Sequence, residues 1–430
     1  MPEIIVAGGG LAGLAATAAL CSAGHSVKLF EARPFLGGRA TSYEIDSETI
    51  DNCQHILLRC CVNLMDFYRR LGVENDITFH REIFFIEPGG RTSTLRAGIL
   101  PAPNHFAESF LRMSFLSAGE KLDVLRAIRS IKSESTRTDL DRITMLEWLE
   151  EKRQPARAIE RFWRQVLVSA INEELDRMAA VHGLQVFRLG FLARKNSYEM
   201  GVPAVPLGRL YGNDAWARIG QADLKMRAPI EKFVIENGSV DHVVAGGEQI
   251  RADHYVCALP FERVGAIIPD LPLDLAGFEH SPITGIHLWF DRPVTTLPHA
   301  TLLDRTIQWM FNKSEGRYIQ LVVSASRSLE TMPRADVIAL ALRELADFFP
   351  AVRDAKLEKS HVVKEIRATF SAAPGLESRR PLSCTSIPNL FLAGDWTRSG
   401  WPATMEGAVR SGYLAAEAIT GKRFLLPDTA

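Results

Sequence analysis

The chain has 430 residues, which is long enough for two domains with separate hydrophobic cores. Its 50 Lys and Arg residues face 51 Asp and Glu residues, and this net charge of -1 argues against a nucleic-acid partner, because no excess positive charge is left to neutralise phosphates. The six cysteines form neither a C-x-x-C pair nor a His/Cys ligand spacing, so we expect free thiols and no metal site.

The N-terminal stretch is apolar, but no basic segment precedes it, so we do not interpret it as a signal peptide. No run of about eighteen apolar residues occurs elsewhere, and the sequence therefore predicts no transmembrane helix. Free thiols and the absence of these segments together lead us to expect a cytoplasmic protein.

A nucleotide-binding pattern opens the chain, because glycines 8, 10 and 13 match G-x-G-x-x-G between a predicted strand and a predicted helix. Gly8 suits a tight turn, Gly10 leaves room for a pyrophosphate, and Gly13 lets the helix pack closely on the strand. The amides of Leu11 and Ala12 begin the helix and are expected to face the phosphates. The predicted elements are the strand Ile4–Ala7, the helix from Leu11 to Ala23 and the strand Ser26–Phe30.

Glu31 ends the second strand, where its carboxylate is placed to accept hydrogen bonds from ribose hydroxyls. A second glycine pair with basic residues follows and suits the other side of the same diphosphate. This segment consists of Ala32, Arg33, Gly37, Gly38 and Arg39, with Pro34, Phe35 and Leu36 between them. The arrangement resembles the large FAD family that includes amine oxidases and phytoene desaturases, in which the second segment supports FAD.

A polar pentad, Asp51 to His55 (DNCQH), follows residues Ala40–Ile50, which alternate as strands do. Apolar residues then recur at helical spacing from Leu57 to Leu71, and Gly72 occupies the position of a helix stop. We therefore expect the pentad at a strand-to-helix junction, where side chains tend to point into a site.

The middle of the chain predicts short strands over residues 78–100 and then a helical block. The predicted capping boxes pair Ser117 with Glu120 and Thr144 with Glu147. A further helical region is expected from Pro155 to about Leu192, with an interruption near Asn172. Because this block carries no dinucleotide signature, we interpret it as an inserted part of a substrate-side domain.

Residues 105–116 are dense in apolar side chains and lie beside the basic residues Arg112 and Lys121. Two interpretations stay open for this segment. It packs as an ordinary amphipathic helix, or it docks on a membrane surface to collect a lipid. The second interpretation predicts peripheral contact with the inner face of the membrane.

The chain is predicted to return to the nucleotide domain through a hairpin with Asn237-Gly238 at its turn and through the strand Tyr255–Leu259. A second sheet near the helical block is expected to contain the strands Ile283–Phe290 and Ile319–Ser324. A helix is predicted over Asp336–Phe349.

The closing segment is a second anchor: a strand from Leu390 ends at Gly394-Asp395, and a loop leads into a helix to about Ile419. This brings a carboxylate and a helix N-terminus to the cofactor. The positive end of the helix suits the N1/C2 carbonyl edge of a flavin, where negative charge gathers on reduction. The loop and first turn contain Trp401, Pro402, Ala403, Thr404 and Met405.

The pentad and the tail from Gly394 to Gly412, with its Trp-Pro-Ala-Thr-Met-Glu-Gly run, resemble a narrower group, the squalene-associated hydroxysqualene dehydroxylases, over nearly the whole chain. The resemblance implies an amine oxidase-like α/β flavoprotein with a Rossmann-type FAD-binding domain and an inserted mixed-sheet and helical substrate domain. The expected FAD-binding domain comprises residues 1–77, 204–275 and 385–430, and the substrate-binding domain comprises residues 78–203 and 276–384. Departures from the group's pattern are Cys53, which would narrow the space over the flavin, and Arg59.

The resemblance implies reductive removal of an allylic hydroxyl from hydroxysqualene to give squalene, a step of hopanoid synthesis. Hydroxide leaves poorly without a proton, and Asp51 and His55 are the ionisable residues expected to supply or relay it. The alternative is that Asp51 caps a helix and His55 only packs. The family also implies that Ile230 touches adenine, and a core isoleucine is the alternative. Candidates for the wall of an apolar tunnel are Phe187, Phe191, Tyr198, Trp289, Trp309 and Phe311.

No second G-x-G-x-x-G accompanies the first, so we expect electrons from NAD(P)H that visits the flavin or from a separate reductase. Association with upstream squalene-pathway enzymes is a further expectation. Three other functions stay open: carotenoid desaturation, with hydride moving in the opposite direction; amine oxidation; and non-catalytic carriage of a prenyl lipid.

Overall fold

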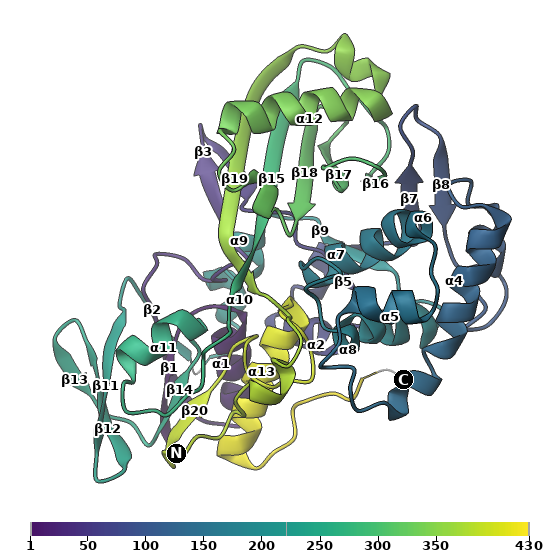
Figure 1. The fold of residues 1–430 in the computed structure, drawn as a ribbon. Helices are drawn as coiled ribbons and strands as arrows, with labels where there is room; N and C mark the ends of the chain where they lie inside the picture. The colour runs from purple at the N-terminus through teal and green to yellow at the C-terminus, as the bar shows by residue number, and fades with distance from the viewer. Residues whose placement is uncertain (1, 221, 429–430) are drawn as a thin grey trace.

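The N-terminal segment folds into the strand-turn-helix-strand unit expected from its glycines, in a computed structural model that describes residues 2–220 and 222–428. Its strands join a five-stranded parallel sheet of order β10-β2-β1-β14-β20 (Figure 1). The strands are β1 (Glu3–Ala7), β2 (Ser26–Glu31), β10 (Ala222–Met226), β14 (His254–Cys257) and β20 (Leu390–Leu392). Four separate stretches of sequence therefore build one sheet.

Two helices from opposite ends of the chain pack together on this sheet. Helix α1 (Leu11–Ser22) is buried from Leu11 to Cys21, so no side of it faces solvent except near its end. Helix α13 (Met405–Thr420) lies against it so closely that a Cβ added at Gly412 would come 2.2 Å from the Ala12 carbonyl oxygen. The alanines and glycines of the two helices therefore let the middle of α13 pack directly on the first turns of α1.

A seven-stranded mixed sheet forms the upper part of Figure 1, in the order β19-β15-β18-β17-β16-β7-β8. Its strands are β7 (Ile83–Ile86), β8 (Thr92–Leu95), β15 (His280–Phe290), β16 (His299–Leu302), β17 (Trp309–Ser314), β18 (Tyr318–Ser324) and β19 (Leu357–Phe370). Alternation places Ile286 and Leu288 in a core with helix α12 (Arg334–Phe348). The opposite face, which includes Trp309, is directed toward the helical block.

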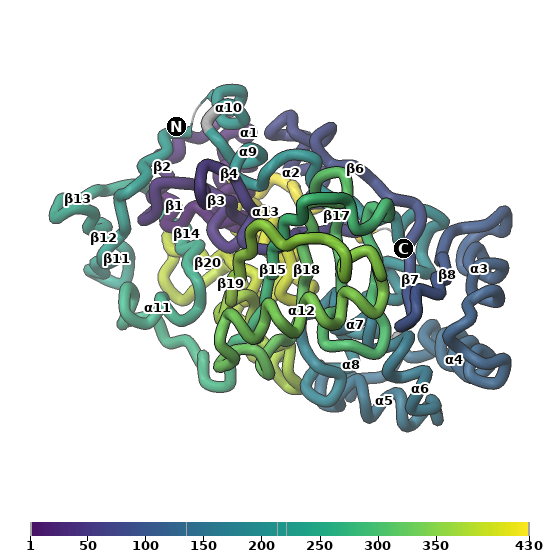
Figure 2. Tube along the Cα trace, turned by 90° about the horizontal axis from the view of Figure 1, so that it is seen from above, coloured from purple at the N-terminus to yellow at the C-terminus, as the bar shows by residue number. Residues whose placement is uncertain are grey.

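The helical block lies beside this sheet (Figures 1 and 2). It contains α3 (Ala107–Arg112), α4 (Ala118–Ser130), α5 (Met145–Glu151), α6 (Ala156–Ala158), α7 (Gln165–Ile171) and α8 (Ala180–Gln185). Both capping boxes are confirmed, at Ser117–Glu120 and Thr144–Glu147. The expected interruption is also confirmed, because Asn172 ends α7 with a left-handed φ of 59°. Segments Ile159–Arg164 and Val186–Leu192 are π-helical.

Smaller elements connect these parts. The strands are β3 (Ser42–Ile45) with β4 (Glu48–Asp51), β5 (Leu57–Leu58) with β9 (Met200–Pro203) and β6 (Ile77–His80), and β11 (Ile230–Glu236), β12 (Ser239–Ala245) and β13 (Glu248–Ile250). The helices are α2 (Val62–Leu71), α9 (Leu207–Leu210), α10 (Asn213–Trp216) and α11 (Phe261–Ile267). Among the described residues, none of the helices is long and apolar enough to span a bilayer.

The prediction of a helix from Leu57 was wrong. Leu57 and Leu58 form strand β5, because they pair with Gly201 and Met200 of β9, and helix α2 begins only at Val62. The pentad therefore lies between two strands rather than at a strand-to-helix junction. The end of this helix was predicted correctly, since Gly72 terminates it with a left-handed φ of 73°.

Candidate active site

The glycine-rich turn between β1 and α1 leaves one side of the backbone open. A Cβ added at Gly13 would come 1.9 Å from the Gly8 carbonyl oxygen, so only glycine allows the helix to lie this close to the strand. A Cβ at Gly10 would meet nothing nearer than the Gly38 Cα atom, at 3.9 Å. The space beside Gly10 therefore fits the backbone approach of a diphosphate.

The first turn of α1 offers amide donors to this space. In the described part of the chain, no side chain caps the amides of this helix at Gly10, and its first turn contains no acidic residue. The amides of Leu11, Ala12 and Gly13 thus need acceptors, and the positive end of the helix dipole adds to their attraction for an anion. These donors and the open glycine fit the diphosphate of FAD.

Glu31 lies at the end of β2, next to the glycine turn. Its Oε2 accepts a hydrogen bond from the Gly9 amide at 2.7 Å, and its Oε1 accepts one from the Arg33 amide at 2.8 Å. The Ala228 amide donates to the Glu31 carbonyl at 2.9 Å, which brings the chain before Ile230 alongside this corner. Ile230 itself is buried at the start of β11. Its contact with adenine, like the ribose role of Glu31, stays a prediction.

The segment from Ala32 to Arg39 crosses in front of the turn. The Gly37 amide donates to the Gly9 carbonyl at 2.9 Å, and Arg33 Nη1 donates to the Gly38 carbonyl at 3.3 Å. Arg39 then reaches the other end of the chain, because its Nη2 donates to Asp395 Oδ1 at 2.6 Å. The two predicted cofactor segments therefore meet.

The Gly394-Asp395 motif is fixed by buried contacts. The Gly394 amide donates to Ser411 Oγ at 2.8 Å, and Trp396 Nε1 donates to the Leu259 carbonyl at 3.0 Å. Arg380, which is 1% exposed, donates to the carbonyls of Asp395, Trp396 and Thr397. Arg380 was not identified from the sequence, because nothing near it in the chain indicates that it shapes this loop.

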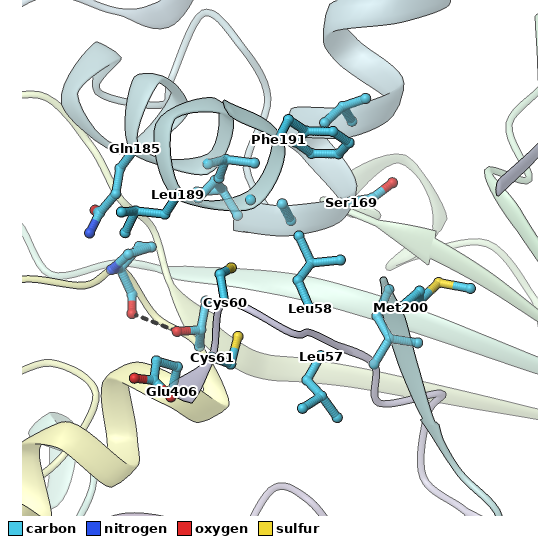
Figure 3. A pocket seen from close by; sticks show the side chains of 18 of the residues that line it. Leu57, Leu58, Cys60, Cys61, Ser169, Gln185, Leu189, Phe191, Met200 and Glu406 are labelled. Carbon is cyan, nitrogen blue, oxygen red and sulfur yellow. Dashed lines mark hydrogen bonds between the residues drawn. The ribbon is translucent and has the colours of Figure 1, made fainter. Parts of the chain in front are cut away.

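An apolar cavity begins at the loop and first turn that precede and open α13 and extends to the seven-stranded sheet (Figure 3). Four predicted cofactor-side residues line it: Trp401, Pro402, Thr404 and Met405. Thr404 also caps α13, since its Oγ1 accepts from the Gly407 amide at 3.0 Å. Ala403 is buried beside them. The cavity wall comes from Ile56 to Leu58, α7, the α8 region, β7 and β8.

Only part of the expected tunnel wall lines this cavity. Phe191 and Trp309 belong to its lining, whereas Phe187, Tyr198, Trp289 and Phe311 do not. Phe187 packs on Trp163 and Phe191, and Trp289 stacks on Tyr318 with ring centroids 4.5 Å apart. These aromatic side chains pack against neighbouring rings, which cover their apolar surface.

The pentad places its two ionisable residues in different contacts. Asp51 Oδ1 accepts from Ser42 Oγ at 2.6 Å and from the Leu207 amide at 2.9 Å. His55 Nδ1 lies 3.0 Å from the Cys53 carbonyl, and burial lowers the pKa of His55. Neither residue belongs to the lining of the apolar cavity. Their proton-transfer role stays a prediction.

Lys313 joins this group from β17 and was not identified from the sequence. Its Nζ donates to Gln54 Oε1 at 3.0 Å and lies 3.9 Å from Asp51 Oδ2. Burial lowers the pKa of Lys313, although the nearby Asp51 charge opposes this shift. An ammonium with a lowered pKa is a stronger acid than an exposed lysine, so Lys313 adds a proton donor to the pentad.

Cys53 and Arg59, the two departures from the group's pattern, differ in their surroundings. Cys53 is buried against β15, where a Cβ added at Gly285 would be 3.8 Å from its Sγ, and burial raises its thiol pKa to about 12. Arg59 donates to Glu199 Oε2 at 2.7 Å and lies over the Phe79 ring, outside the cavity lining. Arg59 therefore does not restrict this cavity.

Glu406 is a further lining residue, and its role was not identified from the sequence. Its Oε2 accepts from the Leu64 amide at 2.7 Å, and its Oε1 accepts from the Asn63 amide and side chain. These amides begin helix α2, so Glu406 caps that helix from α13. Burial raises the pKa of Glu406 to about 7 despite these donors.

Comparisons with known proteins identify the family of the chain. The sequence profile of a family described as flavin containing amine oxidoreductase matches residues 11–420. A 15-cis-phytoene desaturase of Synechococcus elongatus is 27% identical, with 98% of this chain and 96% of that protein covered. The corresponding protein of an Oncidium hybrid cultivar is 28% identical, with 100% and 79% covered.

Solved structures share the fold. An oxidoreductase from Methanosarcina mazei superposes with a TM-score of 0.74 at 16% identity, covering 98% of this chain and 100% of that one. Putrescine oxidase with bound putrescine gives a TM-score of 0.73 at 15% identity, covering 98% and 99%. The amine oxidase-like fold predicted from the sequence is therefore confirmed.

Proposed function

Because this chain belongs to the family of flavin containing amine oxidoreductases and uses FAD, we propose that it reductively removes the allylic hydroxyl of hydroxysqualene to give squalene. The observation that carries the proposal is the apolar cavity that extends from Trp401 and Met405 toward the seven-stranded sheet. Such a lining suits an apolar substrate and excludes water from a developing allylic cation.

The reaction needs one proton and one hydride: the C–O bond breaks, the protonated hydroxyl leaves as water, and a C–H bond forms at the allylic carbon. Bound FAD in its reduced form supplies the hydride. We assign the proton to the group formed by Asp51, Gln54, His55 and Lys313. These four residues are not among those that line the cavity, so we propose that the proton passes through His55, which directly precedes the lining residue Ile56. His55 relays as a neutral imidazole because burial lowers its pKa, whereas Lys313 Nζ holds a proton beside Asp51.

Asp51 does not act alone in this assignment. Its Oδ1 is occupied by Ser42 and Leu207, so only Oδ2 is directed to Lys313. The Asp51 carboxylate therefore raises the pKa of Lys313 and keeps its ammonium protonated until the proton is donated, which leaves a neutral amine. The electrons that reduce the flavin are proposed to come from NAD(P)H or from a separate reductase, since the sequence has one G-x-G-x-x-G pattern.

Anaerobic mixing tests the reaction. Reduced enzyme and hydroxysqualene should give oxidised flavin and squalene in equal amounts, whereas unchanged reduced flavin would reject the proposal. Enzyme without bound flavin serves as the control. Colourless protein that still binds lipid would instead support the carrier function.

A second candidate is desaturation of a carotenoid precursor, which the similarity to phytoene desaturases over nearly the whole chain favours. It uses the same apolar cavity with hydride leaving the substrate. Oxidised enzyme mixed anaerobically with phytoene would then lose the visible absorbance of its oxidised flavin. Bleaching by an amine instead would indicate amine oxidation.

We also propose peripheral contact with a membrane that supplies the substrate. The described residues include seven large hydrophobic side chains that are strongly exposed, and four of them lie between residues 99 and 122. They are Ile99, Leu100, Leu111 and Leu122. Helices α3 and α4 carry part of this surface at the side of the molecule away from the FAD sheet (Figure 2). The packing interpretation applies to Met113, Phe115 and Leu116, which are buried core residues, and the proposed membrane contact concerns only the exposed residues.

A further inference from the structure

The apolar cavity contains polar atoms that lack a partner. Gln165 is 3% exposed and Thr301 is 1% exposed, and both residues line the cavity. Within residues 2–220 and 222–428, Gln165 Oε1 and Thr301 Oγ1 form no hydrogen bond. A buried polar atom without a partner destabilises a folded protein, so its retention at a cavity wall indicates a partner supplied by the ligand.

Trp309 connects the two residues across the cavity wall. Thr301 lies directly opposite Trp309 in the β16–β17 ladder, so their side chains share one face of the sheet. Trp309 Nε1 donates to Ser169 Oγ at 2.6 Å, and Ser169 lies one helical turn after Gln165 on α7. Gln165 and Thr301 therefore lie on two elements, α7 and β16, that contact Trp309.

Local structure directs Gln165 to this position. The π-helical segment Ile159–Arg164 ends immediately before it, and such segments shift the side chains that follow relative to a regular helix. Ser169 Oγ also donates to the Gln165 carbonyl at 2.7 Å, which fixes the backbone of this turn. In Figure 3, Ser169 lies on the opposite side of the view from Glu406.

We propose that Gln165 and Thr301 bind the single hydroxyl of an isoprenoid alcohol, an inference that rests on the proposed function for the nature of the chain. The ligand O–H donates to Gln165 Oε1, and the ligand oxygen accepts from Thr301 Oγ. A hydrocarbon of the same shape leaves both atoms unpaired, so the cavity prefers the alcohol. Loss of the hydroxyl removes both bonds and weakens the hold on the product.

His182 Nδ1 is a third unpartnered atom at this cavity, but its surroundings differ. His182 Nε2 lies 3.8 Å from Glu377 Oε2, and burial followed by the Arg380 charge lowers the pKa of His182 to about 3. The imidazole is therefore neutral, and it lies on α8 rather than beside Trp309. We assign the hydroxyl to the Gln165–Thr301 pair because it offers a hydrogen-bond acceptor on α7 and a donor on β16, two elements that contact Trp309.

Equilibrium binding to the FAD holoenzyme tests the inference, with hydroxysqualene and squalene as the two ligands. The wild-type protein should bind the alcohol about tenfold more tightly than the hydrocarbon. Gln165→Leu and Thr301→Val keep the side-chain shape and remove the polar atoms. Each should reduce the preference to about twofold or less, and squalene should bind at least as tightly as before.

Ser281→Ala is the matched control, because the Ser281 hydroxyl is fully buried and unpartnered in the described residues but lies outside the cavity lining. It should leave the preference unchanged, and the thermal midpoint of each variant verifies folding. Equal binding of both ligands by the wild-type protein, or an unaltered preference in both variants, would overturn the inference. A preference for the alcohol without turnover would reject only the dehydroxylation, and turnover without a preference would reject only the hydroxyl site.

Discussion

Arg39 and Asp395 lie 356 residues apart in the chain and form an ion pair, with Arg39 Nη2 donating to Asp395 Oδ1 at 2.6 Å. Arg39 Nη1 also donates to the Ala368 carbonyl at 2.9 Å. The Asp395 side chain is 7% exposed, whereas that of Arg39 is 37% exposed. The pair therefore joins the second glycine segment to the C-terminal motif at the border of the proposed cofactor site.

We expect Arg39→Met and Asp395→Asn each to weaken FAD binding about tenfold, because either change releases both segments from their common position. The double variant should bind FAD about as well as either single variant, since the two residues act as a unit. Equilibrium titration of the apoprotein with FAD measures these constants. Arg59→Met removes an ion pair outside both segments and should leave the affinity unchanged. Losses that add in the double variant would contradict the coupling.

Gly10→Val should fold without bound FAD. The valine Cβ meets no protein atom nearer than 3.9 Å, so the side chain occupies the space proposed for the diphosphate rather than displacing the protein. The expected result is a colourless protein whose circular dichroism matches that of the apo wild type. Gly119→Val is the control, because a Cβ there also meets no atom within 4 Å. Gly119 lies on α4, outside the glycine-rich turn. A fully yellow Gly10→Val protein would contradict the assignment of this space.

The nucleotide-binding end could be predicted because its signals are local. Gly8 and Gly13 contact each other across a single turn, and the capping boxes at Ser117 and Thr144 use residues three positions apart. Each pattern specifies its own geometry without a distant partner. The closing strand-loop-helix was predictable for the same reason.

The parts of the site that could not be predicted from the sequence depend on contacts between residues far apart in the chain. Leu57 and Leu58 fit a helical apolar spacing, but pairing with β9 makes them a strand. Lys313 approaches Gln54 across 259 residues, and no pattern around it indicates a buried lysine. Thr301 looks like an ordinary strand residue in the sequence, and only the cavity reveals its unpartnered oxygen.

Asp51→Asn should slow turnover of hydroxysqualene at least about tenfold while FAD stays bound. The asparagine oxygen still accepts from Ser42 and Leu207, so the fold is kept, but the negative charge beside Lys313 is lost. The pKa of Lys313 should then fall further, because the Asp51 charge raises it in the wild type. The alkaline limb of the rate profile should move to lower pH. An unchanged rate and profile would remove Asp51 from proton transfer.

The raised pKa of Glu406 leads us to expect that the stability of the folded protein depends on pH. Its pKa is raised from an ordinary 4.5 to about 7, so the folded protein holds this proton more tightly than the unfolded chain does. The stabilising contribution is complete below about pH 4.5 and is lost as the pH rises through 7, a change of at most about 3 kcal/mol. The thermal midpoint of the wild type, measured relative to that of Glu406→Gln from pH 5 to 8, should therefore fall as the pH increases. A constant difference over this range would contradict the raised pKa.

Replacing exposed apolar residues should separate membrane contact from catalysis. Ile99 is 93% exposed and Leu111 is 61% exposed, so aspartate at both positions removes apolar area without disturbing the core. Flotation with vesicles that contain anionic lipids should recover the wild type and at least about fivefold less of the double variant, because the apolar contact is lost and negative charge is added.

Ile366→Asp provides the control, since Ile366 is 53% exposed on β19, away from this surface. Turnover of detergent-dispersed substrate should be unchanged in the double variant, whereas turnover of vesicle-bound substrate should fall. Equal flotation of the two proteins would exclude residues 99–122 as the membrane-contacting segment.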